Sequence, residues 1–125
     1  MTSSLRLRNN QIGDISSELC QLTNLEFLNV ESNLIRSLPA EIGNLINLTF
    51  LNLSQNELIN LPAEISKLSK LQSLNLYQNQ LQRFPVEVTK LSNLRELHLD
   101  NNQIIFLPTT IKNLINLNSG LNVRN

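Results

Sequence analysis

The sequence predicts an α/β solenoid, a right-handed β-α superhelix with a parallel sheet on its concave side and short helical or irregular segments on its convex side. Three regularities support this prediction. Asparagines recur every 23 residues, at Asn10, Asn33, Asn56, Asn79 and Asn102. Prolines share a second column with the same period, at Pro39, Pro62, Pro85 and Pro108. Apolar residues fill further columns in step with both, as expected of a small unit stacked on copies of itself.

The period divides the whole chain, residues 1–125, into the repeats of a single domain. The boundaries are a partial repeat 1–21, full repeats 22–44, 45–67, 68–90 and 91–113, and a partial repeat 114–125. Each repeat is expected to bury its apolar columns against its neighbours, so that the core is continuous along the stack.

Each repeat contains an alternation of apolar and polar residues, which is the period of a strand with one buried face. Leu28-Asn29-Val30 shows it, and the same pattern returns at 51–53, 74–76 and 97–99. The recurring strands are expected to stack in parallel.

The periodic asparagine follows where the chain must leave the sheet. Its amide can satisfy backbone groups of its own and the neighbouring turns, so replacing Asn56 with alanine should cost roughly 1–3 kcal/mol. The proline then fixes a backbone dihedral on the return side, where no ladder hydrogen bond is needed. Acidic residues two positions later, such as Glu41 and Glu64, suit the first turn of a short helix.

Three segments carry a family resemblance: LTNLEFLNVESNLIRSLP, LINLTFLNLSQNELINLP and LSKLQSLNLYQNQLQRFP. They resemble leucine-rich repeats of the intracellular 23-residue type, with the pattern LxxLxxLxLxxNxLxxLPxxIxx. Similar arrays occur in Ras-binding scaffold proteins, the scribble and erbin group, plant intracellular Ras-group proteins, Roco GTPases and many bacterial proteins. The resemblance implies a protein partner and, by analogy, a small GTPase or a signalling enzyme.

The composition indicates which classes of partner and which cellular location to expect. Ten basic and ten acidic residues cancel, which argues against general electrostatic attraction to nucleic acid or an anionic membrane. No apolar run approaches the roughly 18 residues of a membrane span, and MTSSLRLRNN lacks the apolar stretch of a secretory signal. A lone Cys20 forms no internal disulfide, so a cytoplasmic location is expected.

Both chain ends fall inside a repeat, and the last repeat departs from the pattern after Leu117 by one extra residue. Solenoid ends need capping because a bare end exposes apolar columns. Two explanations are open: the chain is a fragment of a longer protein, or two copies associate end to end.

A partner site is expected on the concave face, where alternate strand residues point outward. The aromatic side chains Phe27, Phe50 and Tyr77 cross adjacent strands there beside neutral amides, a composition typical of interface hot spots. The alternative is that the phenylalanines merely cover the sheet edge. The predicted contact residues are Phe27, Asn29, Glu31, Phe50, Asn52, Ser54, Asn75, Tyr77, Glu96, His98 and Asp100.

Catalytic and metal chemistry are weakly supported. Glu96, His98 and Asp100 project from one strand, yet exposed charges on an open sheet more often form a contact surface than a metal or acid-base site. Cys20 and His98 fall on opposite sides of the stack and cannot form a nucleophile and base. Glycines are too scattered for a phosphate-binding loop, and we expect no metal, no cofactor and no enzyme activity.

Apolar residues off the pattern, Ile59, Ile105 and Phe106, mark a second surface on the segments that descend from the sheet. Either a missing C-terminal segment buries them, or they contact a partner. The sequence therefore predicts a protein-protein interaction module. The alternatives are the recognition part of a larger multidomain enzyme, such as a Roco GTPase or a ligase, and a structural assembly element joined through its ends.

Overall fold

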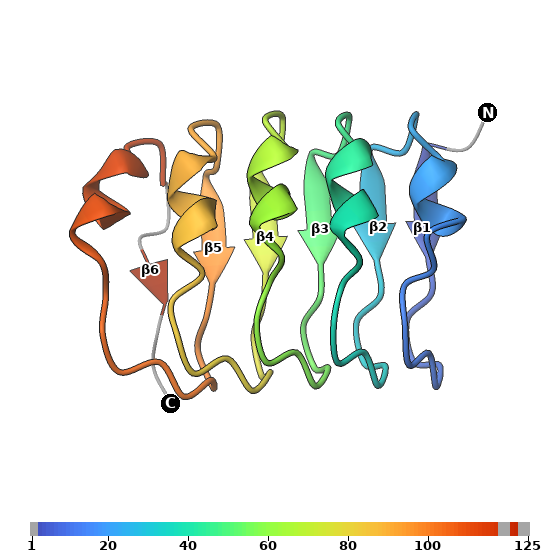
Figure 1. The fold of residues 1–125 in the computed structure, drawn as a ribbon, viewed down its shortest axis with the longest axis horizontal. Coiled ribbons are helices and arrows are strands. Elements are labelled where there is room, and N and C mark those ends of the chain that lie inside the picture. The colour runs from blue at the N-terminus through green and yellow to red at the C-terminus, as the bar shows by residue number, and fades with distance from the viewer. Residues whose placement is uncertain (1–2, 118–120, 123–125) are drawn as a thin grey trace.

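A computed structural model describes residues 3–117 and 121–122. Short strands and 3₁₀ helices alternate along the chain, so that strands lie on one side of the stack and helices on the other (Figure 1). The strands are β1 (Ser4–Arg6), β2 (Phe27–Asn29), β3 (Phe50–Asn52), β4 (Ser73–Asn75), β5 (Glu96–His98) and β6 (Leu121–Asn122). The helices are η1 (Leu19–Gln21), η2 (Ala40–Asn44), η3 (Ala63–Lys67), η4 (Val86–Lys90) and η5 (Thr109–Asn113).

The strands form one parallel sheet in chain order, from β1 to β6. Equivalent residues of successive repeats pair, as Leu28 pairs with Leu51 and Leu51 with Leu74. The last pair differs, because Leu97 pairs with Leu121 and so absorbs the extra residue noted in the sequence. The chain coils in the right-handed sense from the N-terminus, and the predicted α/β solenoid is confirmed (Figure 1).

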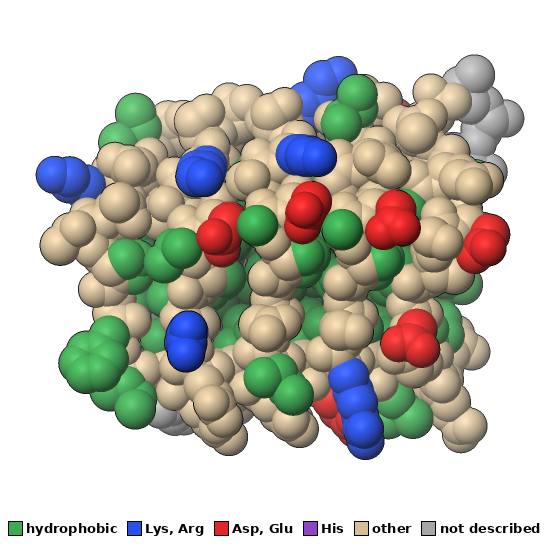
Figure 2. All heavy atoms as spheres, in the orientation of Figure 1, with side chains coloured by type: hydrophobic (Ala, Val, Ile, Leu, Met, Phe, Trp, Pro, Cys, Tyr) green, Lys and Arg blue, Asp and Glu red, His purple; other side chains and the backbone are tan. Residues whose placement is uncertain are grey.

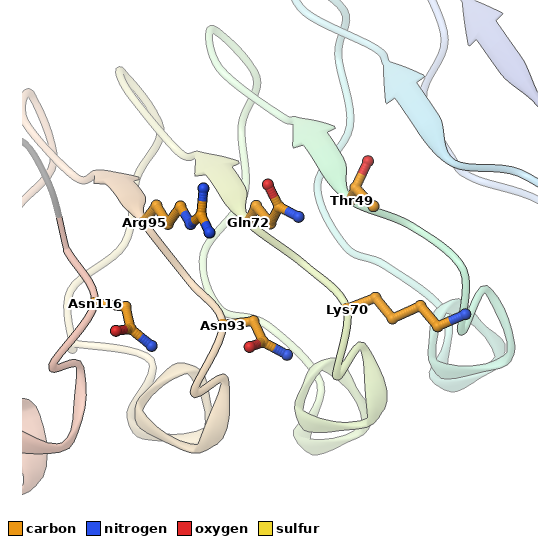
Figure 3. A pocket seen from close by; sticks show the side chains of 6 residues that line it. All are labelled: Thr49, Lys70, Gln72, Asn93, Arg95 and Asn116. Atoms are coloured by element: carbon orange, nitrogen blue, oxygen red, sulfur yellow. The ribbon is translucent and has the colours of Figure 1, made fainter.

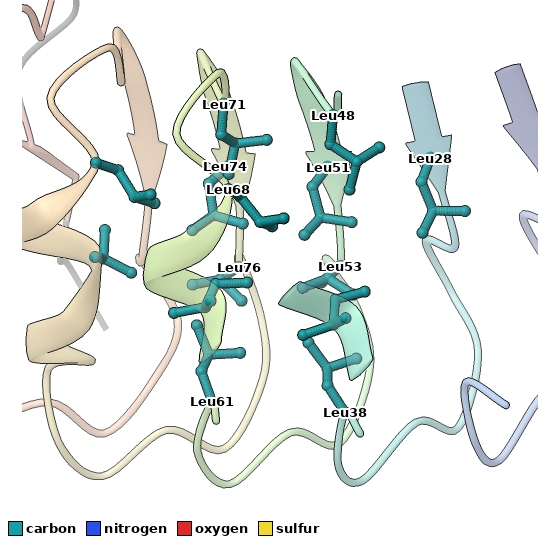
Figure 4. Packing of buried hydrophobic residues seen from close by; sticks show 14 of the residues in the cluster. Leu28, Leu38, Leu48, Leu51, Leu53, Leu61, Leu68, Leu71, Leu74 and Leu76 are labelled. Carbon is teal, nitrogen blue, oxygen red and sulfur yellow. The ribbon is translucent and has the colours of Figure 1, made fainter. Parts of the chain in front are cut away.

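The core is a ladder of leucines between the sheet and the helices (Figure 4). Leu51 from β3, Leu74 from β4 and Leu48 just before β3 are fully buried. Burying one such side chain contributes about 1.5–3 kcal/mol, and each leucine has partners in the repeats on either side.

Burial weakens in the outer repeats. Leu22 and Leu107 occupy columns that are buried in interior repeats, yet both are exposed, and Ile104 and Ile111 are only half-buried. The physical reason is that a stacked repeat is covered by two neighbours, whereas the outer described repeats have only one.

Proline begins the return segment of each complete repeat. Pro39, Pro62, Pro85 and Pro108 immediately precede η2 to η5 with φ of −72°, −69°, −73° and −73°. Glutamates occupy the first turn of η2, η3 and η4, and together they form a row of acidic side chains across the helical side (Figure 2).

The chain leaves the sheet through a residue with positive φ in every repeat. These residues directly precede the periodic asparagines, and their φ values lie between 55° and 59°: Asn9, Ser32, Gln55, Gln78 and Asn101. None is glycine, so the left-handed conformation carries a steric cost. The hydrogen bonds of the adjacent asparagine hold the bend and offset that cost.

No helix within the described residues is long and apolar enough to cross a membrane.

Candidate functional site

The outward-facing side of the sheet, which we call the strand face, is built by residues that pair across repeats. Register places Phe27 beside Phe50, Phe50 beside Ser73 and Ser73 beside Glu96 in one row. A second row runs Arg6, Asn29, Asn52, Asn75 and His98. The leucine between the two rows points into the core in β2 to β5, so the strand face carries every other residue.

An aromatic stack covers the strand face near its first strands. The rings of Phe27 and Phe50 lie parallel, with centroids 4.3 Å apart and an interplanar angle of 4°. The Arg6 guanidinium lies over the other face of this pair, with its Cζ 4.5 Å from the centroid of Phe27. It also donates a hydrogen bond of 2.6 Å to the Ser4 hydroxyl, which fixes its position over the ring.

Tyr77 does not continue this stack, so the expected aromatic diagonal is interrupted. Phe50 pairs with Ser73, and Tyr77 lies four residues further along, about 13 Å away in the strand direction. Its hydroxyl instead accepts a hydrogen bond of 3.4 Å from the Asn101 amide.

The strand face also holds a polar network around Glu31. One carboxylate oxygen forms a 2.7 Å ion pair with Arg8. The other accepts hydrogen bonds of 3.3 Å from the Asn52 amide and the Ser54 hydroxyl. The network joins three repeats and neutralises the charge of Glu31.

This network changes the placement expected for Asn52 and Ser54. They were expected to project outward, but only 7% and 2% of their surfaces are exposed. The reason is that the side-chain Oδ1 of Asn52 accepts bonds from the Ser54 backbone amide and hydroxyl, while Glu31 binds both side chains from the preceding repeat. Of the predicted contact residues, these two support the surface rather than form it.

Asn29 and Asn75 lie in the same row and remain half-buried. Their side-chain Oδ1 atoms accept hydrogen bonds of 3.0 Å from the backbone amides of Glu31 and Tyr77, two residues on. Such a bond ends the strand locally, so each asparagine has a structural role in addition to the contact role predicted for it.

The far side of the strand face is acidic. Glu96 is exposed and Asp100 is half-buried, and the Nε2 of His98 lies 3.8 Å from a Glu96 carboxylate oxygen. Within residues 3–117 no group of three His, Cys, Asp or Glu side chains is arranged to hold a metal ion.

The periodic asparagines lie at the edge of the strand face and hold it in place. The Nδ2 of Asn33 donates to the carbonyls of Leu7 and Val30, and the Nδ2 of Asn56 donates to the carbonyls of Val30 and Leu53. The Val30 carbonyl is thus shared between two asparagines of successive repeats. Asn79 and Asn102 repeat the arrangement, whereas Asn10 is exposed and bonds only within its own turn.

Sequence reasoning missed a second ladder of amides before the strands. Asn47, Asn93 and Asn116 donate to the carbonyls of Thr23, Ser69 and Ser92, at 2.7–2.8 Å. Lys70 interrupts this column and donates to the Asn47 side chain at 2.9 Å. A shallow polar hollow of about 350 Å³ follows the ladder (Figure 3). The signal was present in the sequence, because residues 24, 47, 70, 93 and 116 share the same period.

Cys20 is buried on the helical side, in η1. Burial raises the pKa of its thiol, and the Glu41 carboxylate raises that pKa further. The fold therefore opposes formation of the nucleophilic thiolate.

We expect Cys20 to react with iodoacetamide far more slowly in the folded chain than in urea. Because the pKa is raised, the rate–pH curve of the folded chain should also lie on the alkaline side of the curve for the unfolded chain. Mass spectrometry of timed, quenched samples measures both rates. Equal rates at neutral pH would show that the thiol is neither buried nor perturbed.

These features define a repeat protein with an open surface on which a partner can be bound: a parallel strand face, periodic asparagine ladders and a helical opposite side. Family models agree: one described as "Leucine-rich repeat region" matches residues 40–121, and one described as "Leucine Rich repeats (2 copies)" matches residues 3–44. The chain belongs to the leucine-rich repeat family.

Solved structures resemble the chain over most of its length. A leucine-rich repeat protein of Leptospira interrogans, LIC12759, is 34% identical with a TM-score of 0.80, over 98% of this chain and 37% of that one. An internalin of Listeria monocytogenes, InlF, is 29% identical with a TM-score of 0.81, over 93% and 33%. The plant peptide hormone receptor RGFR1, solved in complex with RGF2, is 33% identical with a TM-score of 0.82, over 92% and 19%.

This chain therefore spans well under half the length of those structures. No curated protein sequence matched it. The family and these neighbours support a protein-protein interaction module on a fold that typically acts as a non-enzymatic binding scaffold.

Proposed function

We propose that the chain recognises a polypeptide partner through its strand face. The observation that carries the proposal is the Phe27–Phe50 stack, an aromatic pair held rigid on an open sheet. Its two rings are ordered by each other and by Arg6, so that binding them costs little further side-chain entropy. Such preordered aromatic side chains are typical interface anchors.

Charge along the strand face indicates the chemistry of the partner. At the β1 side Arg8 already pairs with Glu31, and the Arg6 guanidinium is held over the Phe27 ring. At the β5 side the carboxylates of Glu96 and Asp100 form no ion pair with Lys or Arg among residues 3–117. We therefore expect the partner to place an apolar group on the aromatic stack and a basic group over β5, which would favour association rate and specificity.

The structural neighbours support a polypeptide ligand, because one of them is a peptide hormone receptor solved with RGF2. The resemblance to Ras-binding scaffolds adds a more specific proposal, a small GTPase or a signalling enzyme in the cytoplasm as the partner. We further propose that this chain acts by binding alone, because Cys20 and His98 lie on opposite sides of the stack.

The length of the neighbours favours a second candidate. Since the matched structures extend far beyond the matched part, the chain is also suited to be the recognition part of a longer protein, including a multidomain enzyme such as a Roco GTPase or a ligase. The same strand face would then select that protein's substrate. Association through the solenoid ends is the remaining proposal, and sedimentation at several concentrations would reveal it.

Affinity capture from a lysate of the source organism tests the main proposal. Replacing Phe27, Phe50 and Tyr77 together with alanine should weaken capture of the specific partner about tenfold or more, because one lost hot spot costs about 2 kcal/mol. Parallel captures with GDP and with a non-hydrolysable GTP analogue test the GTPase proposal.

The matched control replaces three lysines on the helical side, Lys67, Lys90 and Lys112, with alanine. Circular dichroism must first show that both triple variants keep the native spectrum. Equal capture by the native chain and the aromatic variant would place the partner site elsewhere.

A further inference from the structure

We propose a second docking surface on the segments that descend from the sheet, which takes a partner polypeptide carrying a carboxylate beside an apolar side chain. We call this surface the loop groove, and it consists of Ile59, Arg83, Phe84, Val86, Phe106 and Leu107. It lies away from the strand face and does not depend on the function proposed above.

Large apolar side chains are unusually exposed there. Phe106 is 82% exposed, Ile105 beside it is 80% exposed, and Ile59 is 52% exposed. Figure 2 shows hydrophobic side chains gathered at one end of the lower edge, over the loop that leads to η5, next to a basic side chain. Together they form a local concentration of apolar surface on a chain whose leucines are otherwise mostly buried.

Stacking of a further repeat would not cover these side chains. Ile59 and Asn60 belong to a repeat with a neighbour on each side, and both are nevertheless exposed. Ile105 and Phe106 are the equivalent residues two repeats later, so they too point away from the stack. Stacking against a neighbouring repeat therefore does not by itself bury side chains at these positions.

Three neighbouring hollows join these residues into one surface, and Arg83 lines all of them. One, of about 310 Å³, lies between Ile59 and Arg83. A second, of about 270 Å³, extends over Phe84 and Val86. The third, of about 260 Å³, reaches Phe106 and Leu107. A cation thus lies between apolar side chains of three successive repeats, with the amides of Asn60 and Gln82 beside it.

The charge of Arg83 defines the occupant. On an earlier loop, Arg36 pairs with Glu57 at 3.1 Å. Arg83 forms no ion pair with any of residues 3–117, although Glu87 lines one of the same hollows. A partner carboxylate would form a charge-assisted bond with the guanidinium, and apolar side chains on either side would shield it from water.

A second copy of this chain fits the surface less well than an acidic-apolar segment. In a two-fold pairing the same surface meets itself, so that the central Arg83 of one copy would lie near Arg83 of the other. The like charges would oppose that assembly.

Selection from a displayed library of short random peptides tests the proposal. The bait is the full-length chain with Phe27, Phe50 and Tyr77 replaced by alanine and shown to be folded, so that the strand face cannot dominate the selection. We expect enriched peptides to carry Asp or Glu next to Leu, Ile or Phe. Their affinity for the native chain, measured by fluorescence polarisation, should fall about tenfold in Arg83→Gln and about tenfold in Phe106→Ser.

Both test residues are exposed, and thermal unfolding should confirm that neither substitution changes the fold. The exposed control Gln21→Ala, in η1 on the helical side of the first repeat, should bind like the native chain. No enrichment, enrichment of basic peptides, or equal binding by Arg83→Gln would overturn the proposal. Self-association that Phe106→Ser abolishes would also overturn the proposal, because the occupant would be a second copy of the chain. Co-sedimentation with phosphatidylserine vesicles that the same substitution abolishes would overturn it too, because the occupant would be a lipid surface.

Discussion

Replacing Asn56 with alanine is expected to lower the free energy of unfolding by about 3 kcal/mol. This is the upper end of the cost of leaving a buried polar group without a hydrogen-bond partner. The Oδ1 of Asn56 accepts a 3.0 Å bond from the Ile35 amide in the preceding repeat. Its Nδ2 donates to the carbonyls of Val30, Leu53 and Ser54, each at 3.1 Å. Water reaches little of this site, so alanine leaves the Ile35 amide without a partner.

Asn10→Ala provides the matched control, since Asn10 occupies the same column but is exposed. Its Nδ2 bonds only to the carbonyls of Leu7 and Arg8, at 3.0 and 3.2 Å. Water can replace these bonds, and we expect a loss of about 1 kcal/mol or less. Urea titrations followed by circular dichroism measure both changes. Similar losses at the two positions would contradict the role assigned to the ladder.

Gly43→Ala is expected to destabilise the chain by about 1–3 kcal/mol, because the added methyl group has no room. A Cβ atom at Gly43 would lie 2.8 Å from the backbone carbonyl oxygen of Glu64 and 3.0 Å from the Cδ of Lys67. The lysine side chain can move away, but the carbonyl is fixed in η3. The helices η2 and η3 would have to separate, which would disturb the packing of Ile42 and Ile65 below them.

Gly13→Ala tests the same chemical change where space is available, since no atom lies within 4 Å of its added Cβ. We expect no loss there, and a gain of up to about 1 kcal/mol through the less flexible unfolded chain. Thermal unfolding of Gly43→Ala and Gly13→Ala, measured side by side, compares the two changes in stability. A Gly43→Ala variant as stable as Gly13→Ala would show that the two helices do not approach so closely.

Periodicity made the fold predictable, because one local pattern repeats and each copy makes the same contacts with its neighbours. The pairing of Leu28 with Leu51, and of Leu51 with Leu74, follows from residues that recur at the same position. So does the turn from Pro39 into η2. A solenoid needs no long-range pairing beyond the next repeat, so a pattern within the sequence is enough to specify it.

The candidate site was less predictable because its side chains make contacts that differ from one repeat to the next. Nothing in the positions of Asn52 and Ser54 shows that the Glu31 carboxylate of the preceding repeat binds both side chains. Likewise, the sequence puts Phe27 and Phe50 in adjacent strands, but only the structure shows their rings stacked. The conformation of a side chain on an open face depends on its neighbours in three dimensions, and the identities of the residues at equivalent positions do not specify that conformation.

The two proposed surfaces differ in the chemistry that they would recognise. The strand face offers an aromatic pair together with the carboxylates of Glu96 and Asp100 and suits a basic partner. The loop groove offers apolar side chains around one guanidinium and suits an acidic segment. A chain with both could hold two partners at once, with little competition between them.

Amide hydrogen exchange of the chain, alone and with its captured partner, tests whether the strand face is the recognition surface. We expect slower exchange in the segments around β2, β3 and β5, and unchanged exchange in η2, η3 and η4 on the opposite side. Protection confined to the helical side, with unchanged exchange in those strand segments, would contradict recognition through the strand face.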